Sequence, residues 1–239
     1  MKYSPFSFLA VVLVAFGGWT APLSAAVLVS YTFNSGNGNP APTDEALSAS
    51  VAAWNGYASG VGFSSTTQSA YVSGTVLSKT FTTTQYLSFT VEAAEGSLLD
   101  LDSITIELGG SIPASGTTSQ NSALQVRTSG DEFASSLVFT PGGSTEALIT
   151  VSEIGKTEYA FFTVDLSGLA PTGSITFHLH PYGPPPLSGS NFLRFGSVEL
   201  EGQIVAVPEA STFGFGLVGA AMLLGLVRRS RRLARFSHL

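Results

Sequence analysis

Two histidines, His178 and His180, are the first candidates for chemistry in this sequence. They alternate with Ile175, Phe177 and Leu179. In a β-strand, residues i and i+2 point to the same face, so both imidazoles share a face opposite the apolar one. Two imidazoles can contribute to a metal site, but no third ligand stands near them in the sequence. We therefore predict two solvent-facing histidines on an outer strand, and no metal site.

Two acidic pairs are candidates for a calcium site. Asp100 and Asp102 flank one leucine, and Asp131 adjoins Glu132. Calcium requires several oxygen ligands that converge from a loop. Aspartate is also common in turns for backbone reasons, which explains Asp131 equally well. A structural calcium ion stays open as an alternative, and we expect no other cofactor.

Catalytic groups are harder to find. Glu199 and Glu201 share one face of a strand, so they cannot flank a sugar from opposite sides as a glycosidase requires. The sequence has no Gly-x-Ser-x-Gly elbow, no phosphate-binding loop and no His-Glu-x-x-His helix. It also has no cysteine, which excludes thiol catalysis and disulfides. We predict that the protein is not an enzyme.

Aromatic side chains are candidates for stacking against sugars. Five such residues are Trp54, Tyr57, Tyr71, Tyr182 and Phe192. Most aromatic residues of a β-sandwich pack in its core, and we expect this of Trp54 and Tyr57. Tyr182 directly precedes a stiff stretch of three prolines at 184–186, which indicates an exposed loop. We predict Tyr182 as the glycan contact.

The charge distribution excludes one class of partner. Between Val27 and Ala206 the chain has four basic residues against 15 acidic ones, a net charge of −11. Such a surface repels phosphate backbones, so we expect no nucleic-acid binding.

The elements that must position these residues are strands. Gly, Ser and Thr are abundant and only 11% of residues are charged, which favours strands and turns. The clearest strand-like stretches are 27–33, 75–81, 86–91, 101–108, 123–127, 159–166, 174–180 and 192–205. About ten short strands without helical periodicity indicate an all-β fold, an antiparallel β-sandwich of jelly-roll type. We expect its first and last strands to lie side by side, with bends or bulges at Gly196 and Gly202.

The N-terminus is typical of a secretory signal peptide. Lys2 precedes the apolar stretch Phe6–Trp19, Pro22 ends any helix, and small residues at 24–26 suit cleavage before Val27. We predict a signal-peptide helix within residues 1–26, and export through the Sec translocon.

The C-terminus combines a short polar motif, an apolar helix and a basic cluster. The motif consists of Val207, Pro208, Glu209, Ala210, Ser211 and Thr212, and the basic cluster includes Arg228, Arg229, Arg231 and Arg232. The apolar stretch 213–227 spans about 22 Å as a helix at ~1.5 Å per residue, less than the ~30 Å hydrocarbon core of a bilayer. The positive-inside rule keeps the arginines in the cytoplasm and the body outside.

This tail, from Val207 to Arg232, resembles the PEP-CTERM sorting signal of proteins from Gram-negative bacteria. The resemblance implies recognition by exosortase, a membrane peptidase that removes the tail, and delivery to the cell surface or extracellular matrix. Bacteria with this system typically make exopolysaccharide. The usual second proline of the motif is Ala210 here. The body more loosely resembles the jelly-roll domains that often precede such a tail.

Together these features predict three segments. Residues 1–26 form the signal peptide, 27–206 the β-sandwich, and 207–239 the sorting signal, with a transmembrane helix at 213–227 and a basic tail at 228–239. We predict an exported protein that is anchored in the inner membrane until it is processed, with a structural or adhesive role at the cell surface. The alternatives are a carbohydrate-binding module for an exopolysaccharide and, after it, a glycan hydrolase.

Overall fold

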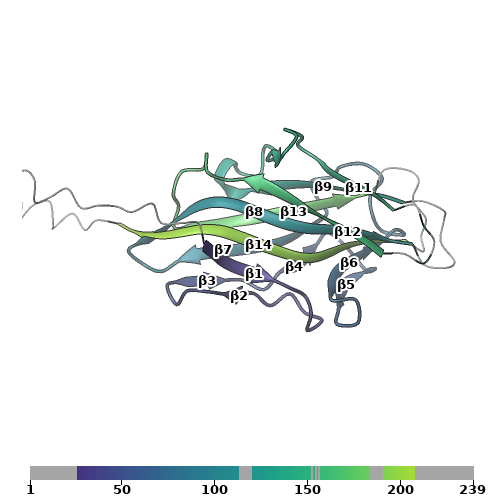
Figure 1. Cartoon of the computed structure of the whole chain (residues 1–239), viewed down its shortest axis with the longest axis horizontal. Coiled ribbons are helices and arrows are strands. Elements are labelled where there is room, and N and C mark those ends of the chain that lie inside the picture. The colour runs from purple at the N-terminus through teal and green to yellow at the C-terminus, as the bar shows by residue number, and fades with distance from the viewer. Residues whose placement is uncertain are drawn as a thin grey trace, which may run out of the picture.

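Two antiparallel β-sheets pack face to face (Figure 1). The computed structural model describes residues 26–112, 120–151, 153, 155, 157–183 and 191–207. Sheet A runs in the order β10 (Phe139–Thr140), β12 (Thr157–Asp165), β8 (Ser97–Ser111), β14 (Phe192–Ala206), β1 (Ala26–Tyr31) and β2 (Ala41–Pro42). The hairpin of β5 (Val61–Ser64) and β6 (Ser69–Ser73) joins it through β14. Sheet B runs in the order β11 (Ala147–Val151), β9 (Gln120–Thr128), β13 (Ser174–Tyr182), β7 (Tyr86–Ala93) and β3 (Leu47–Ala49), and β4 (Ala53–Asn55) also pairs with β7.

The predicted all-β antiparallel sandwich is confirmed, and its jelly-roll type stays a prediction. Within the described ranges, the single helical element is the 3₁₀ turn η1 (Ser129–Asp131). No helix found there has the length and apolar character required to cross a bilayer. The predicted signal peptide lies outside the described residues except for its last residue, Ala26, and so does the sorting signal beyond Val207.

The core lies between the sheets and follows from the alternation of the strands. Inward residues of β7 and β13 are fully or almost fully buried: Leu87, Phe89, Val91, Ile175, Phe177 and Leu179. Successive side chains of a strand point to opposite faces, so the residues between them lie on the outer face of sheet B. The polar and charged candidates for a functional site therefore lie on the outer faces of the sheets.

The long strand β14 bends where glycine was predicted to allow it. Its pairing with β8 shifts register between Phe195 and Val198, and again between Glu201 and Gly202. A Cβ at Gly196 would overlap the Glu107 carboxylate, and one at Gly202 would overlap the carbonyl oxygen of Asp100. The bulges predicted at both glycines are confirmed.

The first and last strands pair as expected, which brings both described ends of the sandwich together. Ala26 pairs with Gly202, and the N–H of Val207 donates to the carbonyl oxygen of Gly96. The hairpin β5–β6 pairs with the other end of β14, near Phe192 (Figure 1).

One predicted strand is wrong. Residues 75–81 form turns and bends after β6. The N–H groups of Val76 and Leu77 both donate to the carbonyl oxygen of Ser73, which closes a turn in place of a strand ladder. Leu77 is nevertheless buried in the core, so the apolar residues of this stretch were a signal for burial and not for a strand.

Candidate binding pocket

The two histidines share the outer face of β13, as predicted, but they do not face solvent freely. The ring of His178 is stacked between Tyr86, 3.8 Å away, and Phe133, 3.7 Å away. His180 is 2% exposed and its Nδ1 lies 3.1 Å from the carbonyl oxygen of Thr82. The predicted exposure of His180 is therefore wrong, because loop residues around Phe81 and Thr82 fold over this face.

This covering changes the titration of the pair. Burial, together with the smaller effect of the neighbouring His180, lowers the pKa of His178 to about 4. Burial also lowers the pKa of His180, although its hydrogen bonds to the backbone of Thr82 and Gln85 oppose the shift. Both rings are consequently neutral at pH 7, as parts of an aromatic cluster.

The acidic pairs do not converge on a calcium site. Asp131 ends η1, and its Oδ2 accepts a hydrogen bond from the N–H of Ser135, which is a turn role. Asp100 instead accepts a hydrogen bond from the side-chain amide of Gln203. In the part of the chain that the structure describes, no three His, Cys, Asp or Glu side chains are grouped as metal ligands would be.

Glu199 and Glu201 occupy one face of β14, as predicted, with buried Leu200 between them on the other. Glu201 accepts a hydrogen bond from the Ser103 hydroxyl at 3.0 Å. Two carboxylates side by side on one strand do not enclose a substrate.

Tyr182 was expected in an exposed loop, and that expectation is wrong. It is a residue of β13, pairs with Ala123 of β9, and is 6% exposed. Burial raises the pKa of its hydroxyl, and the adjacent Glu146 raises it further. The strand continues through Pro181 and ends at Tyr182, two residues before the first of the three prolines. The structure provides no exposed ring at Tyr182 for a glycan.

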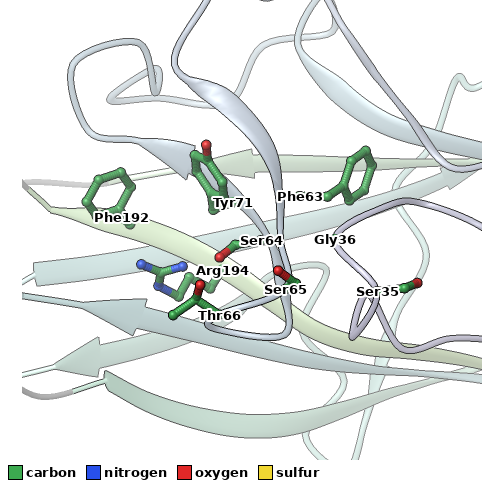
Figure 2. A pocket seen from close by; sticks show the side chains of 9 residues that line it. All are labelled: Ser35, Gly36, Phe63, Ser64, Ser65, Thr66, Tyr71, Phe192 and Arg194. Atoms are coloured by element: carbon green, nitrogen blue, oxygen red, sulfur yellow. The ribbon is translucent and has the colours of Figure 1, made fainter.

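A different pair of the candidate aromatics, Tyr71 and Phe192, lines a pocket on the outer face of sheet A (Figure 2). We call it the Arg194 pocket. Its volume is about 520 Å³. It is lined by Ser35, Gly36, Phe63, Ser64, Ser65, Thr66, Tyr71, Phe192 and Arg194. Three segments meet there: the loop after β1, the β5–β6 hairpin and the start of β14.

Arg194 is the cation of this pocket. It is 8% exposed, and its Nη1 donates to the hydroxyls of Thr67 at 2.9 Å and Ser69 at 3.1 Å. Its Cζ lies 5.1 Å from the centroid of Phe192 and 5.9 Å from that of Tyr71. Such spacing is within the range of cation–π attraction. Figure 2 shows the guanidinium on the same side of the pocket as Phe192 and Thr66.

Glycines make room for aromatic rings to lie against sheet A beside Arg194. Gly62 faces Tyr71 across β5 and β6, and a Cβ there would meet the Tyr71 hydroxyl at 3.0 Å. Gly109 faces Tyr159 across β8 and β12, and a Cβ there would overlap the ring. Burial raises the pKa of Tyr159, whose hydroxyl is hydrogen-bonded to Ser69. The outer face of sheet A therefore carries a transverse row of Tyr71, Arg194 and Tyr159.

Sequence reasoning missed Arg194 and the hydroxyls around it. Arg194 stands in an apolar stretch, Phe192–Phe195, where it is the one charged residue. A single cation in a strand of an acidic domain was the available signal. The Ser64–Thr66 turn carried no signal beyond that of an ordinary loop.

Comparison with known proteins assigns no family. No protein-family model matches the chain, and neither does any curated protein. Among solved structures, a family 29 carbohydrate binding module from Piromyces equi is 10% identical with a TM-score of 0.34, over 74% of this chain and 91% of that one. A CBM4 structure is 12% identical with a TM-score of 0.31, over 64% of this chain and 78% of that one. Values this low assign neither a family nor a ligand to this chain.

Proposed function

We propose that this protein is an exported, non-catalytic domain that binds polysaccharide through the Arg194 pocket. The observation that carries the proposal is the composition of that pocket: aromatic rings, a row of hydroxyls and one buried guanidinium around about 520 Å³. Ligand pockets of proteins commonly measure 300–1,000 Å³ and combine apolar walls with a few oriented polar groups.

Sugar chemistry fits these walls. A pyranose has an apolar C–H face, which is attracted to the negative face of an aromatic ring. Tyr71 and Phe192 supply such rings, in edge-to-face contact with each other at 5.8 Å. The hydroxyls of Ser64, Ser65 and Thr66 can both donate and accept, as sugar hydroxyls do.

The position of the pocket suits a protein tethered by its C-terminus. Val207 lies at one end of β14 and Arg194 near the other, separated by about 40 Å at ~3.3 Å per residue. A tail that continues from Val207 into the membrane would leave the pocket on the far side of the sandwich. Recognition by exosortase and release to the cell surface are part of the proposal, and the sequence of the tail supports them.

The binding proposal is tested by titrating purified protein with a panel of neutral and acidic polysaccharides in a calorimeter. We expect saturable binding to at least one, and about tenfold weaker binding for Tyr71→Ala, which corresponds to ~1.4 kcal/mol. The matched control is Leu148→Ser, which removes a 57% exposed apolar side chain from sheet B. An equal loss of affinity in both variants, or no saturable binding to any polysaccharide of the panel, would contradict the proposal and favour a purely structural role.

The sorting proposal has its own test. Replacement of Pro208 and Glu209 by alanine should leave the full-length protein in the inner membrane of its host, as detected by fractionation and gel migration. Unchanged release and migration would show that the motif is not a processing signal.

A further inference from the structure

We infer that the Arg194 pocket binds a uronate unit, a sugar whose carboxylate pairs with Arg194. This inference rests on the proposed polysaccharide-binding function and specifies its ligand. Arg194 holds its charge away from solvent. The residue is nine-tenths buried, yet its hydrogen-bond acceptors are two neutral hydroxyls, those of Thr67 and Ser69.

No carboxylate compensates this charge within the described part of the chain. No Asp or Glu of the described residues is among the groups that shift the pKa of Arg194. Burial lowers its pKa, but a guanidinium stays protonated at neutral pH. A buried charge without a counter-ion is costly, and an anionic ligand would remove that cost.

Arg194 reaches the pocket with the small exposed part of its side chain. Its Nη1 is engaged by Thr67 and Ser69, and two aromatic rings lie against it. The buried Nε has no hydrogen-bond partner among the described residues. The Nε–Nη2 edge presents parallel N–H groups, the geometry that a carboxylate accepts in bidentate fashion. Because Nε is closed to solvent, the side chains that cover it have to shift when the ligand enters.

The lining of the pocket is compatible with an anion although the domain is acidic. Its nine residues include no Asp or Glu, whereas residues 27–206 contain 15. Glu107, which accepts a hydrogen bond from Ser197, lies one row along sheet A and is not part of the lining. Charges beyond about 8 Å are largely screened at physiological ionic strength. Glu107 is closer, at about 7 Å along the sheet for ~3.3 Å per residue, so it opposes an anion more than the other acids do.

A uronate fits better than other anions. A carboxylate is planar and matches the fork of arginine, and the sugar ring that carries it presents hydroxyls to Ser64, Ser65 and Thr66. The preference should therefore be for single carboxylates on hydroxyl-rich rings.

The test uses matched ligands: short oligouronates of several stereochemistries, each beside its methyl ester, titrated into purified protein by calorimetry. At least one acid should bind about tenfold or more tightly than its ester. Arg194→Gln should abolish this difference. Thr66→Asp, at an exposed site of the pocket, should also abolish it by placing a carboxylate beside Arg194 without removing a core residue. Thr83→Asp adds the same charge on an exposed loop beside sheet B and should preserve the difference.

The outcomes separate the two proposals. Binding of esters as tight as that of acids, or an effect of Thr83→Asp equal to that of Thr66→Asp, would overturn the uronate inference and leave glycan binding standing. Tighter binding of a sulfated oligosaccharide than of every uronate would overturn the carboxylate assignment. Absence of binding to every acidic and neutral glycan would overturn the proposed function itself.

Discussion

The two outer faces of the sandwich use the same residue types to different ends. On sheet B, Arg127 lies 4.5 Å from the ring of Phe81 and donates to the backbone oxygen of Phe133, whose own ring covers His178. On sheet A, Arg194 also lies against aromatic rings, but its hydroxyl partners leave a pocket beside it. We call these the closed face and the open face.

The difference lies in the loops and not in the sheets. The loop that carries Phe81 and the segment after η1 that carries Phe133 fold back over sheet B. The β5–β6 hairpin on sheet A instead presents small hydroxyl residues, Ser64 to Thr66, at the pocket. An arginine that contacts aromatic rings thus has a structural role where a further ring covers it. Where small side chains surround it instead, it is a candidate binding residue.

The largest expected effect comes from the closed face. Tyr86→Ala removes a ring that stacks on His178 and lies 5.3 Å from His180, and should lower the free energy of unfolding by about 3 kcal/mol. Tyr71→Ala, on the open face, should lower it by only about 1 kcal/mol. Urea denaturation of both variants measures the two free energies of unfolding. Equal decreases would contradict the proposed difference between the faces.

Glycine substitution on the open face should have the next largest effect. Gly109→Ala places a methyl group where the Tyr159 ring lies, and also within 2.7 Å of the carbonyl oxygen of Glu158. Such overpacking costs about 2 kcal/mol. Gly62→Ala requires only a small shift of Tyr71 and should cost less. Thermal denaturation compares the two variants. A smaller loss of stability for Gly109→Ala than for Gly62→Ala would contradict the position of the Tyr159 ring against Gly109.

Acid should destabilise the protein through the closed face. The folded-state pKa of His178 is lowered to about 4 from an ordinary 6.5, and that of His180 is lowered too, so the unfolded state binds protons first. This contribution to stability is fully present above pH 6.5 and is lost as the pH falls toward 4. The urea midpoint should drop across this window, and should drop less in His178→Phe, which keeps a ring in the stack. Parallel profiles for the two proteins would refute this assignment.

The smallest effect is expected for an exposed ring on sheet A. Phe161 is 68% exposed and lies outside the pocket, so Phe161→Ser should change the free energy of unfolding by less than about 0.5 kcal/mol. A loss above ~1.5 kcal/mol in a urea titration would mean that this face is covered in solution.

The sequence predicted the sandwich because its strands follow a period of two. The alternation of Ile175, Phe177 and Leu179 placed the core, and Gly196 and Gly202 placed both bulges. It failed at Tyr182 and His180 because exposure depends on which distant loop covers a strand, and that is not a local property. Arg194 was missed for the same reason: its pocket forms only when the loop after β1, the β5–β6 hairpin and β14 meet.

The distinction between the faces is tested most directly by mapping a bound oligouronate by NMR. Titration of isotope-labelled protein should give saturable chemical-shift changes at the side-chain N–H groups of Arg194. The backbone amides of the lining residues Ser64, Ser65, Thr66 and Phe192 should shift with them, while the signals of His178 and Phe133 stay fixed. Shifts centred on His178 and Phe133, with Arg194 unchanged, would contradict the account.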